Sequence, residues 1–161
     1  MRWLLVDRID FMEEGKSARG AKTWPADSVF FEDHFPKFPV VPGVLLMEAL
    51  AQLAGKLIGY TVRKERGDWP FPILSMMNGV KFRKFVRPDQ EVVLETKILS
   101  LRDEMAVVQS RAKLDGRTVA QAEQIFVFNA VALENEEDRQ TVERLERAQL
   151  RQLWADYPED E

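Results

Sequence analysis

Residues 30–52, FFEDHFPKFPVVPGVLLMEALAQ, contain the only histidine of this 161-residue chain, His34, and a carboxylate fourteen positions later, Glu48. A side chain that titrates near neutral pH is a natural general base. Three prolines stiffen the backbone between the two residues, and Gly43 precedes an apolar run that predicts a helix. The pattern therefore predicts a rigid loop with a base, followed by a helix with an acid near its start.

Glu48 interrupts the apolar sequence LLMEALAQLAG of this helix. A carboxylate on a buried helix is costly unless it is paired or functional, which favours a functional role. Gln52 follows four residues later on the same helical face, where it can hydrogen-bond Glu48 or a ligand.

The same stretch, together with LLVDRI at 4–9 and KF at 81–82, resembles the active-site signature of the β-hydroxyacyl-acyl-carrier-protein dehydratases of the FabZ/FabA type. The resemblance extends to about residue 130. It implies an α+β hotdog fold, an antiparallel β-sheet wrapped around one long central helix. It also implies dehydration of 3-hydroxyacyl thioesters to trans-2-enoyl thioesters, in fatty acid or related lipid and polyketide biosynthesis. The substrate would be carried on the phosphopantetheine of acyl carrier protein, with no metal or redox cofactor.

The resemblance assigns roles to individual residues. His34 would remove the C2 proton, Glu48 would help the hydroxyl leave as water, and the backbone N–H of Gly43 would polarise the thioester carbonyl. Four neighbouring residues would bind the substrate: Phe35, Pro42, Val44 and Gln52. In this family one active site takes its histidine and its carboxylate from different subunits, so we expect a homodimer, with a hexamer of three dimers as a further assembly.

Three positions depart from the family pattern. Asp33 and Lys37 stand where the family usually has glycine, and a positive φ at Lys37 would cost about 1 kcal/mol or more. Asp33 could raise the pKa of His34, but adjacent residues of an extended stretch point in opposite directions. The segment that often carries a gating tyrosine contains Trp69 and Phe71 instead.

Composition indicates one domain with a sizeable core, because 45% of the residues are hydrophobic. No cysteine is present, which excludes disulfides and thiol chemistry, and a single histidine excludes a multi-histidine metal site. No apolar stretch is as long as a membrane span, so we expect a cytoplasmic protein without a membrane partner.

Charge divides unevenly along the chain. Ten of the 27 acidic and four of the 23 basic residues lie in 134–161, so residues 1–133 carry a slight positive excess. A basic cluster in VKFRKFVRPD is either a solvated strand end or a patch for the acidic carrier protein: Lys81, Arg83, Lys84 and Arg87. No motif points to nucleic acid.

Periodicity predicts the remaining elements. We expect a strand region at about 3–24, the helix at about 44–60, a loop at 64–72, and strands at about 73–82, 91–101, 105–114 and 118–130. Asp115-Gly116 predicts a hairpin between the last two strands. Ala122, Phe126 and Phe128 are expected in the core rather than in a ligand site.

A second unit is predicted at 134–161, after a dehydratase-like domain at 1–133. Residues 136–154 form an amphipathic helix pattern with an apolar stripe at Val142, Leu145, Leu153 and Trp154. Glu143 and Arg147 have the spacing of a favourable pair along the helix. We expect this helix to dock on its own domain or on a neighbouring subunit; a free-standing interaction helix is the alternative.

Two other functions remain compatible with the sequence. One is different thioester chemistry on the same fold, as in a coenzyme A hydratase or a thioesterase; the retained histidine and glutamate favour dehydration. The other is a non-catalytic subunit that binds acyl carrier protein, suggested by Asp33 and Lys37.

Overall fold

The protein is built on one antiparallel sheet, seen in a computed structural model that describes residues 3–128 and 135–158. The strand order is β1-β2-β4-β5-β6-β3. The strands span Arg8–Glu13 (β1), Ser17–Thr23 (β2), Ile73–Phe82 (β3), Glu91–Leu101 (β4), Met105–Leu114 (β5) and Arg117–Val127 (β6). A short 3-10 helix, η1, covers Val29–Glu32, and two α-helices cover Gly43–Arg66 (α1) and Glu136–Leu153 (α2).

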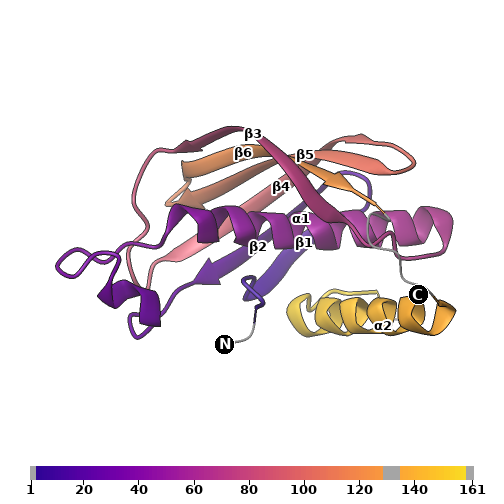
Figure 1. Ribbon diagram of the computed structural model, residues 1–161, viewed down its shortest axis with the longest axis horizontal. Helices are drawn as coiled ribbons and strands as arrows, with labels where there is room; N and C mark the ends of the chain where they lie inside the picture. Colours follow the sequence, from indigo (N-terminus) through magenta and orange to yellow (C-terminus); the bar gives the residue numbers. More distant parts are fainter. Residues whose placement is uncertain (1–2, 129–134, 159–161) are drawn as a thin grey trace.

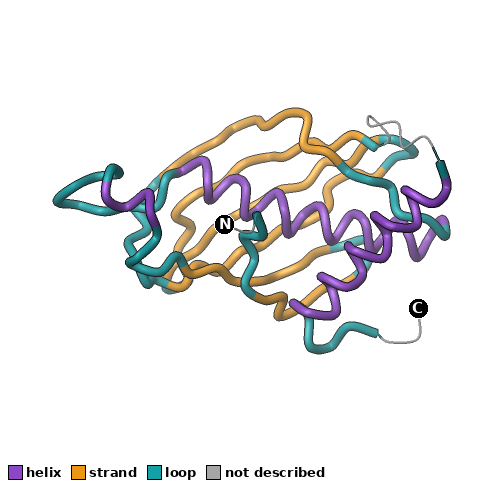
Figure 2. Tube along the Cα trace, turned by 60° about the horizontal axis from the view of Figure 1, so that its bottom comes forward, coloured by secondary structure: helices purple, strands orange, loops and turns teal. Residues whose placement is uncertain are grey.

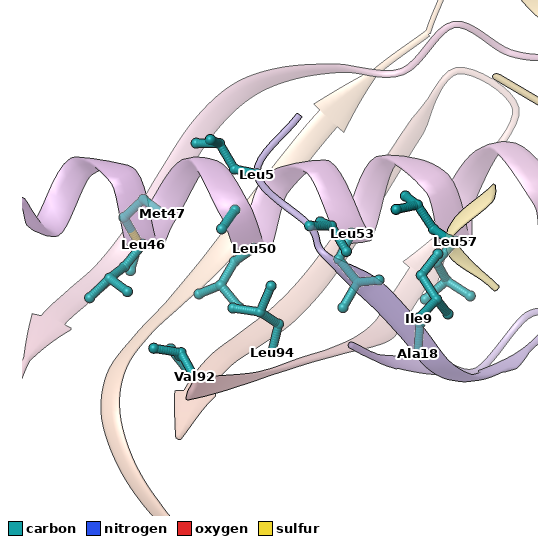
Figure 3. Close-up of a cluster of buried hydrophobic side chains, with 14 of the residues drawn as sticks. Leu5, Ile9, Ala18, Leu46, Met47, Leu50, Leu53, Leu57, Val92 and Leu94 are labelled. Atoms are coloured by element: carbon teal, nitrogen blue, oxygen red, sulfur yellow. The ribbon is translucent and has the colours of Figure 1, made fainter. Parts of the chain in front are cut away.

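The helix α1 lies in the curve of the sheet and contacts strands β2 to β6 (Figure 1). Alternate residues of the strands turn inward to meet it, as expected for a sheet with one covered face. Figure 3 shows the α1 side chains facing strands β1, β2 and β4. Buried residues of this core include Leu46, Leu50, Leu53 and Leu57 of α1, Ile9 of β1, Ala18 of β2, and Val92 and Leu94 of β4.

The C-terminal helix α2 docks on its own chain, beside α1 and next to β1 (Figure 2). Leu150 is fully buried and belongs to the same core as α1. Lys56 and Arg63 of α1 form ion pairs with Glu146 and Glu143 of α2. The docking expected from the amphipathic pattern is therefore confirmed, on the chain's own domain.

Details of α2 differ from the sequence expectation. Leu153 and Trp154 of the expected stripe are buried, but Leu145 is 61% exposed, and Leu150, which the expected stripe did not include, is buried in its place. Glu143 forms its ion pair with Arg63 of α1 rather than with Arg147, which had been expected. Arg147 Nε instead donates to the Tyr157 hydroxyl at 3.4 Å. The expected boundary between residues 133 and 134 lies outside the described residues.

The central helix is longer than expected. It continues to Arg66 because Gly67 closes it in the left-handed conformation, φ 90°, which glycine adopts without strain. The expected absence of a span-length apolar stretch was also wrong: α1 has the length and mean hydropathy, 1.2, to cross a membrane, although 67% of that window is buried inside the fold. Such burial is that of a core helix.

The strands were predicted more closely. Alternate residues of β5 turn inward: Ala106, Val108, Ser110 and Ala112 are buried and Leu114 is partly buried. Ala122, Phe126 and Phe128 are buried as expected. Asp115 and Gly116 both have positive φ, 50° and 77°, which is the geometry of the predicted hairpin turn. The early strand region is in fact a hairpin of two strands, and the last strand ends at Val127, with residues 129 and 130 outside the described part.

One edge of the sheet is open. Strand β3 pairs only with β6, and its other side has no partner strand within the described chain. Large apolar side chains are exposed along it: Met76, Met77, Val80 and Phe82. An open edge with exposed apolar residues is a surface prepared for pairing with another strand.

Candidate active site

Glu48 lies in the second turn of α1 and is half-buried. Its Oε1 accepts hydrogen bonds from Trp3 Nε1 and from Gln52 Nε2, both at 3.0 Å. Gln52 in turn accepts from the backbone N–H of Leu5 at 2.7 Å. The segment before β1 therefore fixes one oxygen of the carboxylate and leaves the other for a ligand.

His34 lies in the loop between η1 and α1 and is also half-buried. Its Nδ1 lies 3.0 Å from the carbonyl oxygen of Val40, while the Val40 N–H donates to the carbonyl of His34 at 2.9 Å. A carbonyl only accepts, so Nδ1 must carry the proton of the ring. The neutral ring then presents Nε2 as a base.

Arg87 holds the histidine loop in place. Its Nε donates to the carbonyl of Pro39 at 2.8 Å, and its guanidinium lies 3.9 Å from the centre of the Phe38 ring. The loop is thus tied to the segment after β3 through the two residues that follow Lys37. These contacts show that Arg87 stabilises the histidine loop, whereas the sequence had suggested only that it belongs to a basic cluster for the carrier protein.

The start of α1 offers free backbone donors. Pro42 precedes the helix without a side-chain cap, and its carbonyl accepts the N–H of Leu45 at 2.9 Å, which leaves the N–H groups of Gly43 and Val44 as the free donors of the first turn. A Cβ on Gly43 would lie 2.6 Å from Cε1 of Phe82. A side chain at position 43 would therefore displace the ring of Phe82, which is exposed.

A cavity of about 620 Å³ opens beside Glu48. Of the expected site residues, Glu48 and Gln52 line it, while His34, Phe35, Pro42, Gly43 and Val44 do not. Both aromatics of the expected gate line it as well: Trp69 is buried, and Phe71 is partly exposed with a φ of 53°. One chain therefore brings the acid and the cavity together but leaves the base outside.

The two departures from glycine cause no backbone strain. Asp33 has a right-handed φ of −100°, and Lys37 is not among the described residues with positive φ. Both side chains are exposed. The penalty considered for Lys37 does not arise.

The remaining cations of the basic cluster, Lys81, Arg83 and Lys84, are exposed near the end of β3. They lie close in sequence to Phe82, which packs on the start of α1. Within residues 3–128 and 135–158, no three acidic or histidine side chains lie close enough together to hold a metal ion.

Comparison with known proteins gives the family. The family model described as the FabA-like domain matches residues 1–123. The chain belongs to this family. It is 38% identical over 126 residues to a protein named 3-hydroxyacyl-[acyl-carrier-protein] dehydratase FabZ from Caldicellulosiruptor bescii, covering 78% of this chain and 88% of the relative.

Two further matches agree with it. A Clostridium botulinum protein of the same name is 41% identical over 126 residues, covering 78% of this chain and 85% of the relative. Among solved structures, the dehydratase heterocomplex ApeI:P from Xenorhabdus doucetiae has a TM-score of 0.63 at 14% identity, covering 86% of this chain and 88% of that one. The latter likeness establishes the fold, and the expected hotdog architecture is confirmed.

Sequence reasoning missed three kinds of site residue. Trp3 precedes the recognised motif, and nothing in its surroundings indicated a bond to Glu48. Arg87 was assigned only to a charge cluster. Lys56, which also lines the cavity, did leave a signal: it interrupts the apolar helix eight residues after Glu48, on the same face as Gln52.

Proposed function

We propose that this protein dehydrates 3-hydroxyacyl-acyl-carrier-protein thioesters to trans-2-enoyl thioesters in fatty acid biosynthesis or a related lipid or polyketide route. The observation that carries the proposal is the match to the FabA-like family over residues 1–123, within which His34 and Glu48 both stand in the motif. The reaction takes place in the cytoplasm and uses no cofactor beyond the phosphopantetheine that carries the acyl group.

The chemistry requires a base, an acid and a group that stabilises negative charge. Nε2 of His34 takes a proton from C2, and the electron pair of that bond forms the C2–C3 double bond. The C3–O bond breaks, and Glu48 donates the proton with which the hydroxyl leaves as water. The first-turn N–H of Gly43 donates to the thioester oxygen while it carries partial negative charge. Phe35, Pro42 and Val44 contact the substrate from the histidine side, and Gln52 from the cavity side.

We propose further that a complete site needs two copies of the chain. His34 does not line the cavity of Glu48 in its own chain. The open edge of β3, with its exposed Met76, Met77, Val80 and Phe82, supports pairing of two β3 strands about a two-fold axis. Such a pairing would bring the histidine loop of one subunit toward the cavity of the other.

Acyl carrier protein is the proposed partner. Lys81, Arg83 and Lys84 are exposed beside the histidine loop's anchoring segment, where they can bind the acidic carrier and the phosphate of its arm. Asp33 and Lys37 were the reason to consider a non-catalytic subunit that binds acyl carrier protein. The backbone at both residues is unstrained, so this reason no longer supports that alternative.

The test is an ultraviolet assay of enoyl formation from 3-hydroxydecanoyl and 3-hydroxybutyryl groups on acyl carrier protein and on coenzyme A. We expect turnover on the carrier, and a loss of at least about a hundred-fold in both His34→Ala and Glu48→Gln. Inactivity of a folded dimer on every thioester would contradict the proposed reaction.

Mixing the two inactive variants tests the shared site. Half of randomly mixed dimers are hybrids, and each hybrid has one intact site, so up to about one quarter of wild-type activity should return. Light scattering of the wild-type protein distinguishes the dimer from a hexamer. If mixing restores nothing although subunits exchange, the base and the acid come from one chain.

A further inference from the structure

The cavity beside Glu48 runs along one face of α1. Glu48, Gln52 and Lys56 line it at intervals of four residues, which places Lys56 about 12 Å along the helix axis from Glu48. Between these ends the walls are largely apolar and include Ala51, Leu74 and Phe126. The cavity therefore extends from the proposed acid in a direction and with a lining that suit a hydrocarbon chain.

The far end of the cavity is polar. Lys56 is only 5% exposed, and its Nζ donates to Glu146 Oε2 at 3.0 Å and to Gln149 Oε1 at 2.6 Å. All three side chains line the cavity. A buried ammonium group has lost most of its hydration and therefore depends on these two hydrogen-bond partners. Replacing them by the hydrocarbon of a substrate would cost a large amount of free energy.

Two of the three side chains come from α2. Glu146 and Gln149 reach the cavity from this helix, which lies beyond the region matched by the family, residues 1–123. The end of the cavity is thus formed by a segment that the family pattern does not contain. Its chemistry must be derived from this chain alone.

We infer that Lys56, Glu146 and Gln149, here called the polar floor, limit the length of the acyl chain that the cavity accepts. The inference rests on the proposed dehydratase function. A chain that stops before Lys56 buries its methylenes against the apolar walls, each worth about four-fold in binding. A longer chain would have to contact the buried ion pair or bend out of the cavity. Methylenes beyond Lys56 would therefore not increase the affinity.

The ion pair could instead serve only to dock α2, and the chain provides a control for this. Arg63 and Glu143 form the second ion pair between α1 and α2, and neither residue lines the cavity. Arg63→Met therefore weakens docking without changing the polar floor. Lys56→Met removes the ammonium group and leaves a carboxylate whose side chain is 32% exposed and can be hydrated.

The experiment measures kcat/KM for 3-hydroxybutyryl, 3-hydroxydecanoyl and 3-hydroxypalmitoyl groups on acyl carrier protein. We expect the wild type to favour 3-hydroxydecanoyl, whose tail ends before Lys56, over the long 3-hydroxypalmitoyl group, and 3-hydroxybutyryl to bind less well than 3-hydroxydecanoyl because it buries fewer methylenes. Lys56→Met should raise the ratio of kcat/KM for 3-hydroxypalmitoyl (long) to that for 3-hydroxydecanoyl (short) by about ten-fold or more. Arg63→Met should leave this ratio unchanged. The double variant K56M/E146L replaces the ion pair by apolar side chains, a change that such sites tolerate, and should shift the ratio in the same direction.

Calorimetric binding of 3-hydroxyacyl-pantetheine amides with the same tails gives a readout that does not depend on turnover. A wild type that turns over long and short groups equally, or a ratio that shifts equally in Arg63→Met, would overturn the polar floor while the dehydratase function stands. The protein could instead be inactive on every thioester while its affinity still falls for longer tails and recovers in Lys56→Met. That result would overturn the dehydratase function and keep the length limit.

Discussion

The carboxylate of Glu48 uses only one of its two oxygens in contacts with its own chain. Trp3 and Gln52 both donate to Oε1, and Oε2 has no partner within the described residues. Gln52 is the central member of this network, because it also accepts the N–H of Leu5 and so ties the N-terminal segment to α1. The orientation of the proposed acid thus depends on a residue outside the motif's reactive pair.

Replacing Gln52 by leucine should show this dependence. Gln52→Leu leaves the N–H of Leu5 without its acceptor and Glu48 without one donor, and we expect the free energy of unfolding to fall by about 1–3 kcal/mol. Urea denaturation measures the change. Gln140→Leu on the exposed face of α2 is the control, expected within about 0.5 kcal/mol of wild type. Equal stability of the two variants would mean that the network contributes nothing.

The sequence indicated the candidate catalytic residues but not the groups to which they are hydrogen-bonded. His34, Glu48 and Gln52 were recognisable because their residue types and spacing follow from the chemistry and from the helical repeat. The Val40 carbonyl that orients His34 belongs to the backbone, and Trp3 reaches Glu48 across 45 positions of sequence. Contacts of these two kinds depend on how the loop and the terminal segment close in three dimensions, which residue types do not encode locally.

Two glycines of the element α1 differ in the space available beside them. A Cβ on Gly59 would lie 2.0 Å from Cζ2 of the buried Trp69, whereas a Cβ on Gly55, one turn earlier, would meet nothing within 4 Å. Gly59 therefore allows Trp69 to lie flat on the helix and close the cavity wall. Phe71, the other aromatic of the expected gate, is partly exposed.

The two glycines give a matched test. Gly59→Ala should lower the free energy of unfolding by about 1–3 kcal/mol, because the Trp69 ring must move. Gly55→Ala should raise it by about 0.5–1 kcal/mol, because alanine loses less conformational entropy in a helix. Thermal and urea denaturation of both variants measures the difference. A stabilising Gly59→Ala would show that Trp69 does not pack as described.

The ends of α1 show how far an element can be predicted. Its start followed from Pro42-Gly43, but apolar periodicity fades after Val62, so the last turn was assigned to a loop. That turn is stabilised by other means: Arg63 pairs with Glu143 of α2, and Gly67 closes the helix. The glycine signal was present in the sequence; the ion pair was not visible, since Glu143 had a closer candidate in Arg147.

In the whole molecule, the helix α2 contributes both to the core and to the cavity. It adds Leu150 to the core and supplies two of the three polar floor residues, and Trp154, just after the helix, forms an isolated parallel β-bridge with Ile9 of β1. The sequence predicted an amphipathic helix and its docking. It could not predict where α2 docks, because a stripe of leucines fits any apolar surface; the ion pairs of Lys56 with Glu146 and of Arg63 with Glu143 specify this one.

This arrangement predicts that α2 and the sheet unfold together. Leu150 is fully buried within the core that contains α1, so Leu150→Ala should lower the free energy of unfolding by about 2–4 kcal/mol. We expect one unfolding transition with the same midpoint by circular dichroism and by tryptophan fluorescence. Fluorescence reports on both regions, because Trp154 lies at the end of α2 whereas Trp24 and Trp69 lie in the rest of the fold. Leu145→Ala, at an exposed position of the same helix, should change stability by less than about 0.5 kcal/mol. Two separate transitions, with α2 melting first, would instead make residues 134–161 an independent unit attached to a complete domain.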